Sequence, residues 1–189
     1  LIIQMQGAEL DASNTVSYGA VTDLRSAGRY EFISVAALDP AAGKITVTAG
    51  CGGLKNDYQA AGHVQVIRVP QYRSLTIGSG TSLVAKPWDG ETGGVLALQV
   101  SDTVTVDGKI DVTGQGFRGG QRGSIRVQRA PGVGSYYRSM SNLDGGSRGE
   151  GIGGRASDYA AVGAYGRGAA AHGGGAGNRV LAGLLEAEL

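Results

Sequence analysis

GVLALQVSDTVTVDGKIDVTG, residues 94–114, contains three short runs rich in Val, Ile and Thr, separated by Ser101-Asp102 and Asp107-Gly108. Residues of this kind favour β-strands, and Asp-Gly is a strong signal for a two-residue turn. The local pattern therefore predicts a hairpin. The alternative is one coil of a β-helix, in which short strands turn at Gly and Asp and stack on further coils.

Similar strand-like runs continue toward the N-terminus and cover residues 1–113. Turn residues separate them at intervals of about 8–15 residues, a spacing typical of sandwiches and stacked β structure. No run shows a convincing helical period. The fold class predicted is all-β, a sandwich or β-helix-like stack of short strands. The expected strands are 1–6, 29–38, 44–50, 63–69, 74–80, 94–100, 103–108 and 109–114.

Glycine dominates the part of the chain that follows. It supplies 35 of 189 residues, about 19% against a usual ~7%, and 20 of these glycines lie in residues 114–177. Extended glycine helices can pack backbone to backbone because no Cβ intervenes. The Tyr, Val, Ile and Arg residues spaced through 143–178 argue against a flexible linker. We therefore expect an ordered irregular or polyglycine-helix segment.

These patterns predict three parts: a β-rich scaffold (1–113), a glycine-rich segment (114–178) and a short C-terminal helix or truncated tail (179–189). Charge divides the chain in a similar place. Residues 1–113 hold 8 Lys and Arg against 11 Asp and Glu, a net −3, whereas residues 114–177 hold 8 Arg against 3 acids, a net +5. Contact between copies, negative half on positive half, is the partner interaction that we expect. The basic half lacks lysine, which makes it weaker than the basic surface of most nucleic-acid binders, and no nucleic-acid partner is predicted.

Catalytic and metal motifs are weak. His63 and His172 lie far apart, and the lone Cys51 indicates a small buried side chain and no internal disulfide. The glycine-rich stretches 114–119 and 149–154 lack the strand–loop–helix context of a dinucleotide site. Asp89 and Glu91 form a candidate acid pair for polysaccharide cleavage, although WDGETGG is also typical of a turn.

No enzyme activity and no cofactor are therefore predicted. Calcium at the turn residues Asp102, Asp107 and Asp111 is an alternative, with turn formation favoured because they lack the dense order of an EF-hand loop. No run of about 18 apolar residues occurs, so no transmembrane segment is expected.

Aromatic and arginine side chains supply the candidate contacts to ligands or to other copies. Trp88, Tyr72 and Tyr58 could act as stacking platforms for sugar rings. The glycine-rich half could present a basic and aromatic surface. The full set of predicted contact residues is Trp88, Tyr72, Tyr58, Arg118, Arg122, Arg126, Tyr136 and Tyr137.

An ordered series of motifs carries a family resemblance across roughly residues 1–178. It comprises LIIQMQGA (1–8), VQVIRVPQY (64–72), WDG (88–90), GQGFRGG (114–120) and GEG (149–151), before a glycine tract that ends at Asn178. This series resembles the N-terminal region of large secreted, glycine-rich bacterial surface proteins, described as adhesin-like or gliding-motility-associated. In composition alone, the tract also resembles phage tail-tip adhesins. RVLAGLLEAEL (179–189) departs from the longer glycine run of the family.

The resemblance implies export, a place outside the cell or on its surface, and no catalytic residues. The expected export signal would lie upstream of this chain. We therefore expect a non-enzymatic structural or adhesive protein that associates with copies of itself into a filament or surface assembly. The alternatives are a polysaccharide-active β-helix enzyme and a carbohydrate-binding module that contacts surface glycans.

Overall fold

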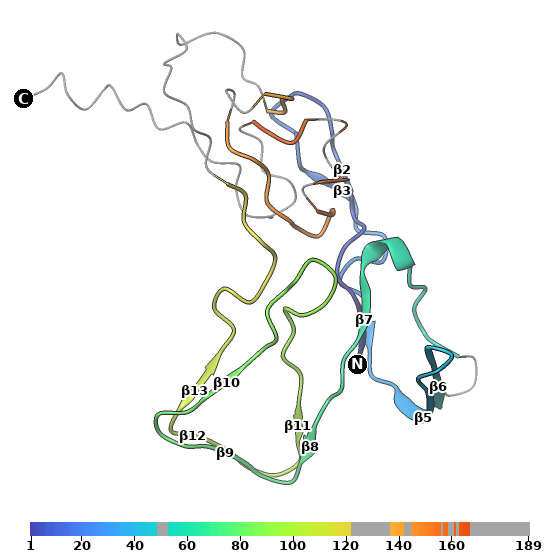
Figure 1. Ribbon diagram of the computed structural model, residues 1–189, viewed down its shortest axis with the longest axis vertical. Coiled ribbons are helices and arrows are strands. Elements are labelled where there is room, and N and C mark those ends of the chain that lie inside the picture. The colour runs from blue at the N-terminus through green and yellow to red at the C-terminus, as the bar shows by residue number, and fades with distance from the viewer. Residues whose placement is uncertain are drawn as a thin grey trace, which may run out of the picture. The chain divides into compact units, whose positions relative to one another are not determined.

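Short strands and turns make up most of the ordered elements (Figure 1). The computed structural model describes residues 1–48, 53–121, 137–141, 145–155, 157–158, 161 and 163–166. Within those residues the labelled helical element is the 3-10 turn η1 (Ala60–Gly62). The predicted all-β class is confirmed at this level. The predicted C-terminal helix, 179–189, lies outside the described residues.

The chain divides into two compact units, each made from two stretches of sequence. Unit 1 comprises Leu1–Gly7 and Ser26–Gly116, and unit 2 comprises Ala8–Arg25 and Phe117–Leu189. A boundary near residue 113 was expected from the sequence. The sequence did not predict that residues 8–25 belong to the same unit as the glycine-rich residues. No local pattern in this short stretch indicates contact with residues far along the chain.

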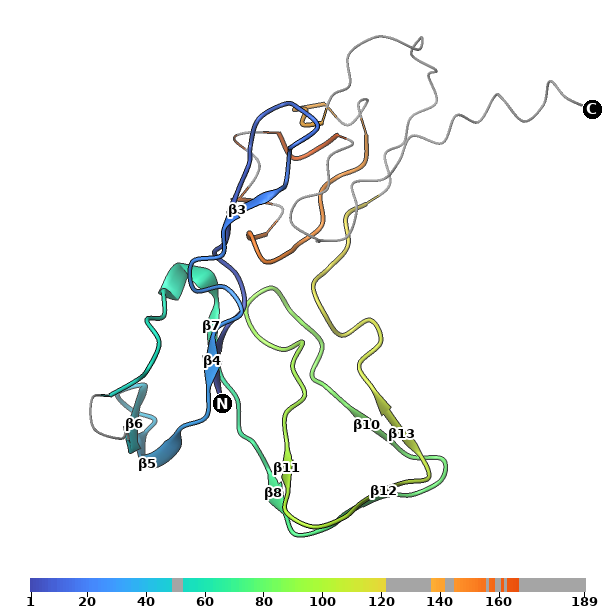
Figure 2. The same ribbon diagram turned by 180° about the vertical axis from the view of Figure 1, so that it is seen from behind.

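Unit 1 contains two coils of chain stacked on one another. We call residues 63–90 the first coil and residues 91–116 the second coil. Three strands of the first coil each pair in parallel with one strand of the second. Figures 1 and 2 show the two coils running side by side around the same bends. The pairs are β8 (Gln71–Tyr72) with β11 (Gln99–Val100), β9 (Leu75–Ile77) with β12 (Val104–Val106), and β10 (Ser82–Val84) with β13 (Lys109–Asp111).

The hairpin predicted at Asp107-Gly108 is therefore wrong. The backbone N–H groups of both residues donate to the Ile77 carbonyl of the first coil, each at 2.9 Å. A Cβ at Gly108 would lie 2.4 Å from the carbonyl oxygens of Gly78 and Thr81. Glycine is required there because the bend presses onto the first coil. An Asp-Gly turn signal specifies the bend and not the strand with which the next segment pairs.

Alternation along the strands places one set of apolar side chains on the inner side of the stack. Ile77 is only 6% exposed, which identifies its side of the sheet as the inner one. Its partner in register, Val106 of the second coil, is 46% exposed. Val104 and Ile110, which pair with Leu75 and Leu83, are similarly open. Within the described residues, each of the three strand pairs is two-stranded, so no further strand covers the second coil.

The N-terminal strands of unit 1 attach to the start of the first coil. β1 (Ile2–Gln4) lies between β4 (Tyr30–Glu31) and β7 (Val64–Val66), antiparallel to both. β5 (Ser34–Asp39) and β6 (Lys44–Thr48) form a separate antiparallel hairpin.

A single carboxylate and a single amide fix the loop that follows this hairpin. Glu31 accepts hydrogen bonds from the backbone N–H of Lys55 and of Asn56, each at 3.1 Å. The fully buried Gln4 accepts one from the N–H of Gln59 at 2.8 Å. The bond from Lys55 is the chief reason that the pKa of Glu31 lies below its usual value.

Close backbone contacts and a few polar side chains hold unit 2 together. β2 (Glu9–Leu10) and β3 (Val21–Asp23) form a short antiparallel pair, which Glu9 and Arg25 join by an ion pair. The N–H of Ala8 donates to the carbonyl of Ile152 at 3.0 Å. Gly166, with φ +121°, lies so close to Tyr137 that a Cβ would be 2.8 Å from its carbonyl oxygen.

Candidate functional site

Polar side chains connect the two coils of unit 1 at a constant spacing of 28 residues. His63 Nδ1 lies 2.9 Å from Glu91 Oε2. Gln71 Nε2 donates to Gln99 Oε1 at 2.8 Å, and Ser74 Oγ donates to Asp102 Oδ2 at 3.4 Å. These side chains fix the register between residues 63 and 74 of the first coil. Further along, the offset between paired residues is 29 at Leu75 and Val104 and 27 at Ser82 and Lys109.

Gln65 makes the most protected of these contacts. Its Nε2 donates to the carbonyl of Gly93, and its Oε1 accepts from the N–H of the same residue, both at 2.9 Å. Both residues are buried. The side-chain amide thus satisfies both backbone groups of Gly93, as a neighbouring strand would.

The aromatic residues predicted as sugar platforms differ in their exposure. Trp88 is 4% exposed and packs edge-on against His63, so its ring faces are not open to a sugar, which corrects that expectation. Tyr58 is partly buried, and its hydroxyl donates to Glu31 at 3.0 Å. Burial raises the pKa of the Tyr58 hydroxyl. Tyr72, in β8, is half exposed and keeps an accessible ring.

The two carboxylates of the candidate acid pair have different partners. Asp89 accepts hydrogen bonds from Lys86 Nζ at 2.7 Å and from the backbone N–H groups of Thr92 and Glu91 at 2.8 and 2.9 Å. The Lys86 bond and these backbone donors hold the pKa of Asp89 well below its usual value. Glu91 instead faces His63. Asp89 stabilises the turn, and Glu91 joins the coils.

The aspartates considered for calcium also act within turns. Asp111 Oδ1 accepts from the N–H of Thr113 at 2.8 Å, and Asp102 faces Ser74. Among the described residues, no three His, Cys, Asp or Glu side chains lie close enough together to hold a metal ion.

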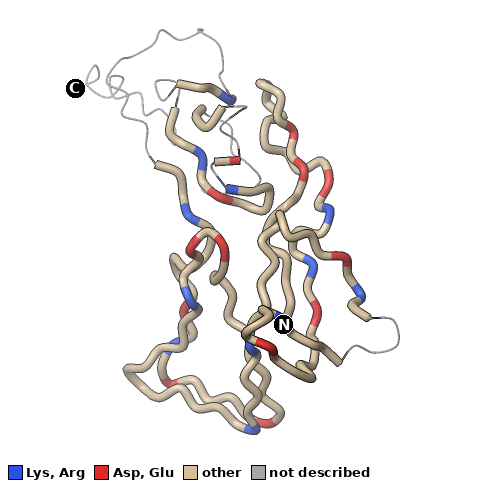
Figure 3. Tube along the Cα trace, turned by 45° about the vertical axis from the view of Figure 1, so that its right-hand side comes forward, with Lys and Arg blue, Asp and Glu red and all other residues tan. Residues whose placement is uncertain are grey.

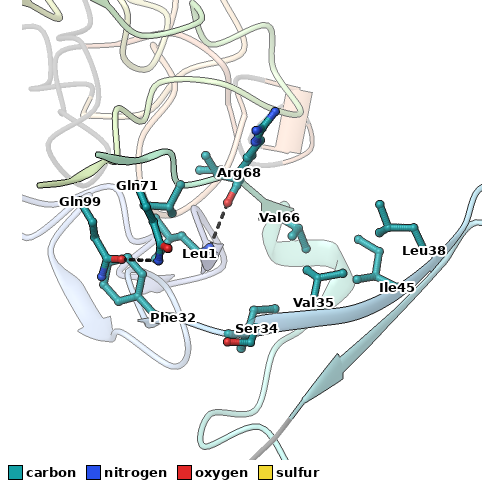
Figure 4. A pocket seen from close by; sticks show the side chains of 13 residues that line it. Leu1, Phe32, Ser34, Val35, Leu38, Ile45, Val66, Arg68, Gln71 and Gln99 are labelled. Carbon is teal, nitrogen blue, oxygen red and sulfur yellow. Dashed lines mark hydrogen bonds between the residues drawn. The ribbon is translucent and has the colours of Figure 1, made fainter. Parts of the chain in front are cut away.

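An apolar hollow of about 610 Å³ lies in unit 1 beside the β5–β6 hairpin. Figure 4 shows Val35, Leu38 and Ile45 of the hairpin on one side and Val66 on the other. Phe32 and the Gln71–Gln99 amide pair close one end. We call these side chains, together with the remaining lining residues, the hairpin hollow. The remaining lining residues are Leu1, Ile33, Ser34, Ile67, Arg68 and Val69.

In unit 2, Arg118 is bound by a buried carboxylate. Its backbone N–H and its Nε donate to Glu150 Oε2 at 3.1 and 2.9 Å, and its Nη2 donates to Glu150 Oε1. The Glu150 side chain is almost fully buried, whereas that of Arg118 is about half exposed. Arg118, predicted as an external contact, thus has an internal partner that links two segments of the unit.

The sequence did not single out Arg148, the most buried charged residue of the described chain at 1% exposure. Its guanidinium donates to the carbonyls of Gly163, Tyr165 and Tyr137 and lies 3.9 Å from the centre of the Tyr18 ring. Burial raises the pKa of Tyr18. A single arginine among glycines does not indicate from the sequence that it is buried. Its guanidinium can nevertheless donate to several carbonyl oxygens at once.

Tyr137 belongs to this same cluster and packs partly buried against Tyr18. Its backbone N–H donates to Asn14 Oδ1 at 2.9 Å. The other predicted contacts of this half, Arg122, Arg126 and Tyr136, lie outside the described residues, as does Cys51.

Comparisons of the chain with protein-family models, with curated proteins and with solved structures find no match. In the part of the chain that the structure describes, no helix is long and apolar enough to cross a membrane.

Proposed function

We propose that this protein is a non-enzymatic extracellular structural or adhesive surface protein whose copies associate into a filament or surface assembly. The observation that carries the proposal is the open second coil of unit 1. Val104, Val106 and Ile110 lie on its inner side and are about half exposed, although their partners in the first coil are better covered. Covering such a row of apolar side chains with a further layer lowers the free energy, because it removes apolar surface from water.

Charge suggests what covers this coil. Residues 91–116 carry Glu91, Asp102, Asp107 and Asp111 against Lys109, a net charge of −3. The glycine-rich half, 114–177, carries a net charge of +5. The acidic coil of one copy placed on the basic half of the next is a heterologous contact, which extends a chain of copies when it does not close into a ring.

The glycine-rich half contributes a backbone-packed body in this proposal. The backbones of Gly166 and Tyr137 approach each other closely, and Arg148 donates hydrogen bonds to backbone carbonyls of separate segments. A segment packed in this way resists proteases, and rapid cleavage within residues 143–178 of the assembled protein would contradict this role. The place outside the cell rests on the resemblance to secreted surface proteins.

Light scattering coupled to size exclusion tests the association. The proposal predicts multimers at low salt that become smaller at high salt, because exposed charges are screened. A strict monomer under all conditions would refute it.

The enzyme alternative depends on Asp89 and Glu91. Both carboxylates serve the scaffold in this structure, so their substitution by Asn and Gln should leave the turnover of any glycan unchanged. A loss of turnover in either variant would favour the enzyme. The binding-module alternative depends mainly on the exposed ring of Tyr72, and a glycan array with the wild type and the Tyr72→Ala variant tests it.

A further inference from the structure

The β5–β6 hairpin has one apolar face without a covering layer among the described residues. Its cross-strand pairs are Val35 with Val47 and Leu38 with Ile45. Leu38 is 66% exposed, and Val35 and Ile45 are about half exposed. A two-stranded hairpin is at best marginally stable in water, and it needs a further strand or a packed face to persist.

The exposed apolar area is large enough for a specific contact. The exposed fractions of Phe32, Val35, Leu38, Ile45 and Val66 leave at most roughly 500 Å² of apolar surface around the hollow, since even an aromatic side chain offers only ~150–250 Å² and the other four are smaller. Two such surfaces together amount to at most about 1,000 Å², near the lower limit for a specific protein interface. A patch of this size lies within the ~300–600 Å² of the largest apolar patch on a typical monomer, which is often functional.

Charge at this site is compatible with a second copy of the same surface. At the tip of the hairpin Asp39 lies directly opposite Lys44, so the tip carries no net charge. These two side chains are next to Leu38 and Ile45 in their strands, so they point to the opposite face of the hairpin and leave no charge of the tip on the apolar face. In Figure 4 the Arg68 guanidinium points away from Val35 and Leu38, so no cation lies between the apolar faces. The acidic second coil, in contrast, would repel a copy of itself.

We propose that two copies of this chain associate through the hairpin hollow, with the apolar faces of their β5–β6 hairpins packed together across a two-fold axis. This contact rests on the proposed function only in taking another copy as the partner. It is isologous, whereas the contact of acidic coil with basic half is heterologous. The two contacts therefore respond differently to salt, since burial of apolar surface does not weaken when charges are screened.

Sedimentation velocity of the full chain at high salt tests the proposal with a matched pair of variants. Leu38→Asp places a charge in the interface of both copies, and we expect the dimer to weaken at least about tenfold. Val84→Asp is the control, because Val84 is 54% exposed in β10 and does not line the hollow. It should change the dimer constant by less than about twofold. Trp88, the single tryptophan, is buried in unit 1 and reports by its fluorescence that each variant is folded.

Cross-linking gives a second measurement that does not introduce a charge. In a Cys51→Ser background, a thiol-reactive cross-linker with a long flexible spacer should join Leu38→Cys copies into covalent dimers and should not join Val84→Cys copies, and the spacer removes the need for residue 38 to lie on the two-fold axis. Equal yields from the two positions would overturn the proposal, as would a high-salt dimer that Leu38→Asp leaves intact. Association at low salt only, insensitive to Leu38→Asp, would refute the hairpin contact and leave the proposed function standing. A monomer at every salt concentration would refute both.

Discussion

Substitution of Gln65 by Leu should destabilise unit 1 by about 1–4 kcal/mol. The change keeps the size of the side chain but removes both hydrogen bonds to Gly93. Two buried backbone groups left without partners cost about 1–3 kcal/mol each, and the greater apolar burial of Leu returns about 1–2 kcal/mol. The net loss of unfolding free energy is large because Gln65 and Gly93 are both buried, so water cannot replace the lost hydrogen bonds.

Urea unfolding followed by Trp88 fluorescence measures this loss directly. Trp88 lies in the same unit, and its Cβ is 3.6 Å from the position that a Cβ of Gly94 would occupy, next to the affected residue. Gln71→Leu is the matched control, since the Gln71–Gln99 amide pair has the same 28-residue spacing but is exposed. We expect it to cost less than about 0.5 kcal/mol. Equal unfolding midpoints for wild type and Gln65→Leu would refute the role assigned to this amide.

Three further predictions concern other parts of the chain. Gly108→Ala should lower the unfolding free energy of unit 1 by about 1–3 kcal/mol in urea, because its Cβ meets backbone oxygens; Gly116→Ala, with open space around it, should not. Arg148→Met should cost unit 2 about 3–5 kcal/mol, seen as faster hydrogen exchange in residues 145–155, because buried carbonyls lose a charged donor. The pKa of Asp89 is lowered by Lys86, so its contribution is present above the ordinary value of 3.8 and is lost as pH falls below that value. Acid should therefore shift the urea midpoint of wild type more than that of Asp89→Asn.

The sequence predicted three strands in residues 94–114, and the structure has three there, although the first covers only Gln99–Val100 of the expected 94–100. It did not predict their partners. Alternating Val, Ile and Thr residues indicate an inner and an outer side, and both a hairpin and a stacked coil satisfy that pattern. A signal for stacking was nevertheless present, because Gln71 and Gln99 recur 28 residues apart, each followed by alternating apolar residues and a Gly. Long-range pairing of this kind appears as a repeat and not as a local propensity.

The site residues show the same limit. Trp88 stands in a turn sequence that favours exposure, yet the packing of the second coil buries it. Gln65 and Arg148 are polar residues that sequence reasoning places on the surface, and the fold buries both because each has backbone groups to satisfy. Composition can suggest a packed glycine-rich half, but it cannot name the arginine on which the packing depends.

The interleaved construction of the two units has a consequence for the order in which they form during translation. Asn14 Oδ1 accepts hydrogen bonds from the N–H groups of Tyr137 and Arg138, and all of residues 26–116 are made between these partners. At the usual speed of a ribosome that interval lasts roughly 5–20 seconds. The two coils can close within it, since their paired residues lie only 27 to 29 residues apart. Residues 8–25 can form their own β2–β3 pair during this time, but Asn14 gains its partners Tyr137 and Arg138 only afterwards. Unit 2 is therefore completed last and joins segments synthesised far apart in time.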